Sequence, residues 1–280
     1  MRNEFLTEAD ISGFRMHLLT AEKSAATEQK YIRDVKSFAK FIGCSKITKE
    51  SVIAYKKHLQ ENYAVRSVNS MLASINSLFA FLGRHDLRVK SLKLQQQIFR
   101  PEEKELTKAE YARLCRTAER RHNERLNLIL QTICGTGIRV SELQYITVEA
   151  VRHGEAVVNC KAKTRSVFIV KELKKKLLLY AQKQNIKSGM IFVTRTGKPI
   201  SRTSIWREMK ALCEEANVNP GKVFPHNLRH LFARVFYGIE KDIAKLADIL
   251  GHSSINTTRI YIISTGTEHR QRMENMHLIL

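Results

Sequence analysis

Two short stretches in the last quarter of the 280-residue chain decide how the rest of it is interpreted. They are HNLRH at residues 226–230 and LGHSSINTTRIY at residues 250–261. Residues 240–250 have the apolar spacing of an amphipathic helix, and Gly251 stands where such a helix commonly ends on a left-handed residue. We therefore expect a helix that closes at Gly251, followed by a second helix that carries Tyr261.

Two further stretches stand upstream. GIRVSEL occupies residues 137–143, and the basic KAKTR occupies residues 161–165 between two β-rich runs. The chain thus carries an arginine box, a hairpin lysine, an H-x-x-R pair, L-G-H and a tyrosine nine residues after His252, in that order. Each motif alone is weak, but together they resemble the tyrosine recombinase (phage integrase) family. The resemblance covers the whole chain and is of the Xer-like or small mobile-element type, with no room for an arm-binding domain before residue 7.

The resemblance implies that Tyr261 is a nucleophile. Its phenol would attack the scissile DNA phosphate, giving a 3′-phosphotyrosyl link and a free 5′-hydroxyl that can attack back. Without the resemblance, a tyrosine beside Ile260 would be interpreted as a core residue. The implied activity is site-specific DNA recombination through a Holliday junction. A topoisomerase-like relaxing enzyme and a non-catalytic DNA-binding protein are the alternatives.

Two arginines are expected to stabilise the transition state. Arg139 and Arg229 can hold the non-bridging phosphate oxygens through planar, paired hydrogen bonds. Glu142 follows Arg139 by three residues, so on a helix it would share the same face and orient that arginine.

The general acid for the 5′-oxygen is expected on the hairpin, where two lysines compete. The resemblance favours Lys161, the first lysine of the loop, and makes Lys163 a phosphate contact. The loop is one residue shorter than the family's common version, so both assignments stay open. Arg165 is expected to contact DNA from the same basic turn.

Three histidines lie within the motifs. The resemblance makes His226 the proton shuttle near the tyrosine, since imidazole titrates close to neutral pH, and makes His252 a hydrogen-bond partner of the phosphate. His230 is expected to pack structurally. No HExxH stretch is present and no Cys/His cluster has zinc spacing, so we expect neither a metal nor a cofactor.

The formal net charge of +21 predicts a polyanionic partner, and double-stranded DNA is favoured over a membrane surface or an acidic protein. The basic residues are spread along the chain and are not gathered in a tail. One predicted helix, residues 27–42, has a basic face opposite its apolar one, and we expect Arg33, Lys36 and Lys40 to contact phosphate there.

The predicted fold is mainly α-helical with a small antiparallel β-sheet. Residues 1–84 predict a four-helix domain, which the resemblance makes a SAM-like core-binding domain, and residues 85–104 predict a basic linker. Residues 105–280 would form the catalytic domain. Within it, β-rich runs at residues 146–151, 156–160 and 166–170 predict a three-stranded antiparallel sheet with a basic turn at 161–165.

The end of the chain, residues 269–280, is rich in apolar side chains. The resemblance implies that this tail docks into a neighbouring protomer within a tetramer on DNA; docking onto its own domain is the alternative. The chain has no apolar run near the ~20 residues of a membrane span, no signal-peptide pattern and five scattered cysteines. These features predict a cytoplasmic protein, and we expect it to integrate or excise a mobile element, with chromosome or plasmid dimer resolution as the alternative.

Overall fold

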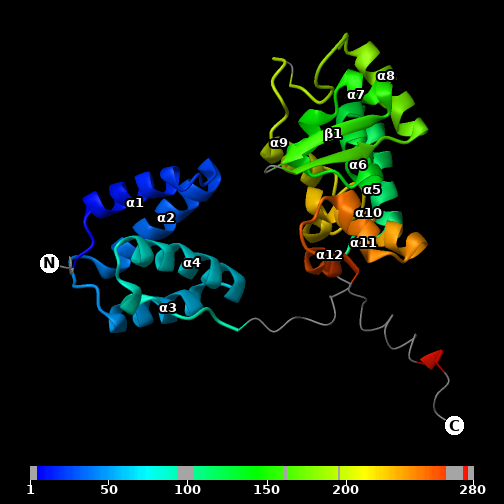
Figure 1. Ribbon diagram of the computed structural model, residues 1–280. Helices are drawn as coiled ribbons and strands as arrows, with labels where there is room; N and C mark the ends of the chain where they lie inside the picture. The colour runs from blue at the N-terminus through cyan, green and yellow to red at the C-terminus, as the bar shows by residue number, and fades with distance from the viewer. Residues whose placement is uncertain (1–4, 94–103, 161–162, 195, 263–273, 277–280) are drawn as a thin grey trace. The chain divides into compact units, whose positions relative to one another are not determined.

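The computed structural model describes residues 5–93, 104–160, 163–194, 196–262 and 274–276, and the chain divides into two compact units, Met1–Gln96 and Gln97–Leu280 (Figure 1). Within the described ranges, helices dominate and the only sheet is a two-stranded antiparallel one. The predicted fold class is therefore confirmed. None of the described helices combines the length and apolar character needed to cross a membrane.

The first unit is a helical bundle. Hydroxyl side chains cap the first three helices. Those of Thr7, Ser24 and Thr48 accept hydrogen bonds from backbone N–H groups of the first turn. Large apolar residues such as Phe14, Phe38 and Phe79 fill the interior. The elements are α1 (Glu8–Thr20), α2 (Ala25–Ile42), α3 (Lys49–Asn62), α4 (Val65–Phe81) and the short 3₁₀ helix η1 (His85–Leu87).

Residues 85–93, where the sequence predicts the start of a linker, lie on this bundle. Val89 is buried in its core, and its backbone exchanges hydrogen bonds of 2.8 and 2.9 Å with the side-chain amide of Asn76. Asn69 makes the same paired contact with the backbone of Leu92. Two asparagines of α4 thus replace the strand partners that this extended segment lacks.

The second unit holds the four motifs. Its helices are α5 (Lys108–Arg120), α6 (Glu124–Thr136), α7 (Val148–His153), α8 (Lys171–Lys183), α9 (Arg202–Ala211), α10 (Pro225–Glu240), α11 (Ile243–Leu250) and α12 (Ile255–Ile262). Two 3₁₀ helices, η3 (Val140–Tyr145) and η4 (Pro220–Lys222), and the strands β1 (Glu155–Cys160) and β2 (Lys163–Phe168) complete the described elements.

The sheet differs from its prediction in the first strand. Residues 146–151 satisfy a strand pattern, but most of them lie in helix α7, and only Thr147 forms an isolated bridge, to Met190. The side chain of Thr147 caps α7 by accepting a hydrogen bond from the Ala150 N–H, and Gly154 ends the helix with a left-handed φ of 90°. The three-stranded prediction was wrong because this local cap outweighs the β-branched composition.

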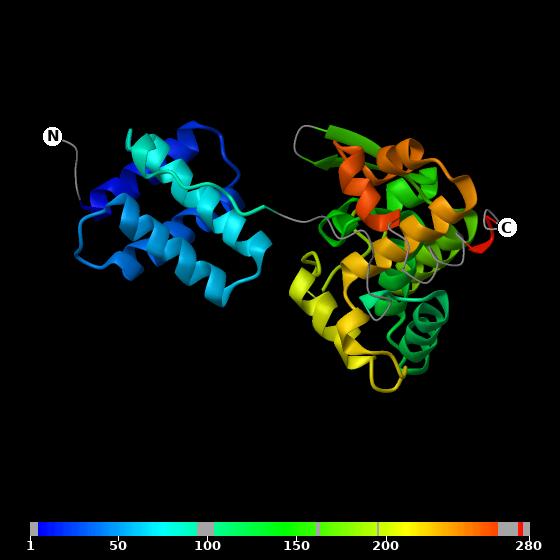
Figure 2. The same cartoon turned by 90° about the horizontal axis from the view of Figure 1, so that it is seen from below.

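Helices α10, α11 and α12 form the part of the unit that matters for function. Helix α10 packs against α6 and against both of its successors, and α11 also contacts β2, as Figure 2 shows from below. Gly251 ends α11 as predicted, with φ 64°. The C-terminal end of α6, the hairpin and the turn after α11 are thereby brought to one place on α10.

The start of the second unit is attached to α10 as well. The Asn227 side-chain amide donates to the backbone carbonyl of Lys104 over 3.0 Å, and Arg234 forms an ion pair with Glu105. Leu106 is buried in the core of this unit. The first described residues after position 103 are therefore attached to the helix that carries the H-x-x-R motif.

Candidate active site

Arg229 lies at the centre of the motif cluster. The helix α10 begins at Pro225, so that HNLRH forms its first two turns and places Arg229 inward, only 2% exposed. Its guanidinium donates to the backbone carbonyls of Gly137 and, over 2.6 Å, of Leu250. Burial first, and then the charge of Arg139, lower the pKa of Arg229 to about 10, which still leaves it charged at neutral pH.

Arg139 stands at the start of η3, two residues after the left-handed Gly137. Its side chain is one-third exposed, and its Nη1 donates to Oε1 of Glu142 over 2.7 Å. Glu142 also accepts from the backbone N–H of Arg139 over 2.8 Å. The prediction that Glu142 orients Arg139 matches this contact, but the two residues form the cap of a 3₁₀ helix and do not share an α-helical face.

Glu142 is a buried carboxylate held by two arginines. Besides Arg139, it binds Arg165, which donates from Nη1 and Nη2 over 3.0 and 2.8 Å. Burial alone would raise the pKa of Glu142, but the hydrogen bonds from Arg165 and Arg139 outweigh it and lower that pKa to about 2. The site therefore contains a permanent negative charge that neutralises part of the arginine cluster.

Tyr261 lies on α12 among three histidine rings, and only 4% of it is exposed. Its Oη is 3.5 Å from Nε2 of His226, and its ring is stacked with that of His252 at a centroid distance of 5.4 Å. The nearest ring is that of buried His230, at 4.3 Å. The structure thus places Tyr261, His226 and His252 together, as the sequence predicts, and adds His230 to the wall around the phenol.

The hairpin lysines are only partly described. Lys161 lies outside the described residues. Lys163 begins β2, where its backbone pairs with Cys160, and its side chain is also outside the description. The predicted turn at residues 161–165 is therefore too long, because Thr164 and Arg165 belong to the strand.

Arg165 does not lie as expected. It was predicted to contact DNA, yet its side chain is only 11% exposed and it is directed toward Glu142 and the carbonyl of Ile249. By contrast, Arg33, Lys36 and Lys40 are exposed on α2 in the first unit. Lys30 of the same helix is turned inward, where its ammonium donates to Asp34, Ser74 and the Ser70 carbonyl.

Two comparisons with family profiles cover both units. Residues 104–268 match the profile described as the phage integrase family, and residues 6–87 match its N-terminal SAM-like domain. The first match alone spans more than half of the chain.

The chain belongs to the phage integrase family.

Relatives of this integrase-family chain with curated names are tyrosine recombinases. It is 27% identical to XerD of Halalkalibacterium halodurans over 94% of this chain and 95% of the relative. XerA of Pyrococcus furiosus is 26% identical, with coverage of 100% and 98%, and XerA of Thermococcus kodakarensis is 29% identical, with coverage of 96% and 95%. The family's enzymes are site-specific DNA recombinases.

Solved structures agree with the fold of this integrase-family chain. A crystal structure of XerA recombinase is 25% identical, with a TM-score of 0.55 and coverage of 98% of this chain and 100% of that one. A lambda integrase tetramer bound to a Holliday junction gives a TM-score of 0.74 at 16% identity, with coverage of 92% and 78%. At that identity the second likeness concerns the fold alone.

Sequence reasoning missed one member of the site and did not foresee the contacts of another. Thr258 is fully buried and its Oγ1 lies 2.8 Å from Nδ1 of His252. Its position three residues before Tyr261 is a helical spacing that could have identified it. Arg165 was noticed but was given the wrong contact, because its partners lie 23 and 84 positions away in the chain.

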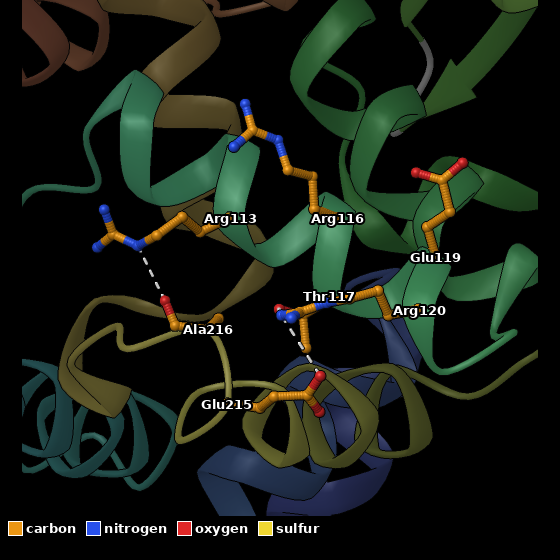
Figure 3. A pocket seen from close by; sticks show the side chains of 7 residues that line it. All are labelled: Arg113, Arg116, Thr117, Glu119, Arg120, Glu215 and Ala216. Atoms are coloured by element: carbon orange, nitrogen blue, oxygen red, sulfur yellow. Dashed lines mark hydrogen bonds and ion pairs between the residues drawn. The ribbon is translucent and has the colours of Figure 1, made fainter.

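A basic pocket of about 480 Å³ in the second unit contains none of the motif residues. Arg113 donates from Nε to the Ala216 carbonyl over 2.9 Å, and Arg120 pairs with Glu215, so two of its three arginines are attached to its walls (Figure 3). Figure 3 also shows Arg116 and Glu119 on the same helix, α5. Among the residues that the structure describes, no group of three or more histidine, cysteine or acidic side chains is placed to hold a metal ion.

Proposed function

We propose that this protein cuts and rejoins DNA at specific sites through a covalent link between Tyr261 and the 3′ end of the broken strand. The observation that carries the proposal is the convergence of Tyr261, Arg229, Arg139, His226 and His252 from four separate segments of the chain. A cluster of this composition suits phosphoryl transfer, because it combines a nucleophile with donors for the phosphate oxygens.

The roles follow from the chemistry of each group. Tyr261 Oη forms a bond to phosphorus as the bond from phosphorus to the 5′-oxygen breaks, and the energy of the phosphodiester is kept in the new ester. Arg139 and Arg229 stabilise the charge on the non-bridging oxygens. His226, whose Nε2 lies 3.5 Å from the phenol oxygen, takes its proton. Lys161 delivers a proton to the departing 5′-oxygen, with Lys163 as the second candidate.

We assign His252 the role of a hydrogen-bond partner of the phosphate, because it stacks on Tyr261 and contacts Arg229 Nη2 at 3.1 Å. Glu142 acts indirectly, through its hydrogen bonds with Arg139. No step in this scheme calls for a metal or a cofactor, since arginines supply the positive charge.

Double-stranded DNA is the proposed partner. The charge of +21 and the exposed Arg33, Lys36 and Lys40 on α2 support it. We propose that residues 1–84 bind DNA, that residues 85–104, which begin on the first unit, form the connection to the second, and that residues 105–280 carry out catalysis. On DNA the protein would assemble as a tetramer with C-terminal tails exchanged between protomers; lambda integrase is a tetramer on a Holliday junction in one solved structure.

For the biological role we propose integration or excision of a mobile element, in the cytoplasm. The described cysteine side chains, Cys44, Cys115, Cys134 and Cys213, are free thiols, in keeping with a reducing compartment. The alternative role is the resolution of chromosome or plasmid dimers by the same chemistry. A plasmid with two direct copies of the site separates the roles: efficient resolution between identical sites supports the second, and a requirement for two unlike sites supports the first.

The covalent step is tested with a nicked duplex that carries DNA flanking the gene, in EDTA. We expect a denaturant-resistant protein–DNA adduct with the wild-type protein and none with Tyr261→Phe. Equal adduct formation by Tyr261→Phe would assign the nucleophile elsewhere. Tight, salt-sensitive binding without an adduct would favour a non-catalytic DNA-binding protein, and an adduct without junction formation would favour the relaxing enzyme.

A further inference from the structure

Arg165 joins three segments that each carry a part of the site. It lies on β2, four residues after Lys161, and its backbone pairs with Val158 in the hairpin. From this strand its side chain reaches Glu142 of η3 and the carbonyl of Ile249 near the end of α11. It therefore connects the hairpin with the segments before and after α10.

The contact with Glu142 is geometrically specific. Both terminal nitrogens of the guanidinium engage both carboxylate oxygens, over 3.0 and 2.8 Å. Such two-point pairing fixes the plane of the carboxylate as well as its distance. The same carboxylate holds the side chain and the backbone N–H of Arg139, so its orientation decides where Arg139 points.

The contact with the end of α11 is close-packed. The Arg165 Nε donates to Ile249 over 3.2 Å, and a Cβ atom on Gly251 would come within 2.5 Å of Arg165 Cδ. The backbone of the L-G-H turn thus lies directly on the Arg165 side chain. His252 follows immediately, and Arg139 Nη2 is 3.4 Å from the Gly251 carbonyl.

We infer that Arg165 is a positioning residue for strand cleavage: it fixes Glu142, and through it Arg139, and it supports the turn that carries His252. Arg165 itself does not contact the phosphate. The side chain is 11% exposed and both of its terminal nitrogens are bonded to a carboxylate, so few donors remain for a DNA phosphate. This inference rests on the proposed function and extends it to a residue that the sequence assigned to DNA binding.

The test separates binding from chemistry. Arg165→Ala and Arg165→Lys are compared with wild type for DNA affinity, for its dependence on salt and for the single-turnover rate of adduct formation on the nicked duplex. We expect unchanged affinity and an unchanged salt slope, with the cleavage rate of Arg165→Ala reduced about 10²-fold, as misplacement by about 1 Å can cause. Arg165→Lys should recover part of the rate, because an ammonium keeps the charge but not the two-point pairing.

Two further variants exclude a general loss of structure. Arg113 is a matched control, since it too spans two segments by donating to the carbonyls of Ala216 and Asn217, so Arg113→Lys should cleave at the wild-type rate. In the Glu142→Gln background, Arg165→Ala should reduce the cleavage rate by a much smaller factor than it does alone, because both changes break the same hydrogen-bonded linkage.

Three results overturn the inference: a wild-type cleavage rate in Arg165→Ala, a salt slope smaller by about one in the same variant, or full additivity with Glu142→Gln. If even the wild-type protein forms no adduct, the proposed function fails and the positioning role is decided by NMR. The Nε–H signal of Arg139 should then shift or broaden in Arg165→Lys and stay in place in Arg113→Lys. An unchanged Arg139 signal in Arg165→Lys overturns the role.

Discussion

Arg229 lies 3.1 Å from His252, with Nη2 of the guanidinium facing Nε2 of the imidazole. A guanidinium has no acceptor atom, so in the protein without DNA Nε2 of His252 must accept this hydrogen bond. The proton of the neutral ring is then on Nδ1, which lies 2.8 Å from Thr258 Oγ1. One buried arginine thereby selects both the protonation state and the tautomer of the histidine beside Tyr261.

His252 should accordingly stay neutral over the range in which ordinary histidines titrate. Burial, followed by the charges of Arg229 and Arg139, lowers its pKa to about 4. The folded state therefore disfavours protonation, and the stability linked to this group is present above the usual pKa near 6.5 and is lost as the pH falls through about 4. Imidazole ¹⁵N shifts should report the Nδ1–H tautomer from pH 8 to pH ~5.5. In Thr258→Val the Nδ1–H tautomer should persist, because Arg229 still donates to Nε2. A wild-type titration midpoint near 6.5 would contradict the assignment.

Glu142→Gln should lower the free energy of unfolding at neutral pH. It should also make that free energy depend less on pH in acid. The pKa of Glu142 is lowered from 4.5 to about 2, which corresponds to on the order of 3 kcal/mol of unfolding free energy. That contribution is present above pH ~4.5 and is lost as the pH falls toward 2. Denaturant unfolding at pH 7, 5 and 3 measures it.

The control for this measurement is Glu119→Gln, a change on the exposed surface of α5. It should leave the free energy of unfolding within about 0.5 kcal/mol of the wild-type value at every pH. An equal pH response in the wild type and in Glu142→Gln would show that the carboxylate gains nothing from its two arginines.

Gly251→Ala should cost more stability than the same change at a glycine of similar backbone conformation. Gly197 has φ 75° and open space around it, so Gly197→Ala should lose only the ~1–2 kcal/mol of a left-handed alanine. At Gly251, φ 64° adds that cost to the displacement of Arg165, a further ~1–3 kcal/mol. Thermal unfolding of both variants, measured side by side, gives the difference. Similar losses would mean that Arg165 moves aside freely.

Removing charge from α2 should change how DNA affinity depends on salt. Each phosphate contact contributes about 0.9 to the slope of log affinity against log salt, so Arg33→Gln with Lys36→Gln should reduce it by roughly 2. Lys187→Gln, at an exposed position in the second unit, should leave the slope unchanged. Fluorescence anisotropy of labelled DNA, at salt concentrations from about 50 to about 300 mM, measures the slope for each variant. An unaltered slope in the double variant would remove α2 from the DNA interface.

The sequence predicted those features that depend on neighbouring residues. The helix end at Gly251 follows from local spacing, and the gathering of Tyr261 with His226 follows from motif order. Residues 146–151 were assigned to a strand because their β-branched side chains are typical of one. In the structure the hydroxyl of Thr147 caps a helix that begins at the next residue. Arg165 was assigned to the DNA-facing turn because nothing near it in the chain reveals its acceptor at Glu142, 23 positions away. The periodicity of apolar residues does not reveal polar partners that are distant in the sequence.

The two glycines beside the catalytic motifs set a steric limit on the active site. At Gly137 a Cβ would lie 2.5 Å from the Phe232 ring, and at Gly251 it would lie 2.5 Å from Arg165, with φ positive at both. Neither glycine takes part in bond breaking, yet each fixes the register of the arginine or histidine that follows it. The active site thus leaves no room for even a methyl group at these two positions, so its geometry is limited by backbone that carries no side chain.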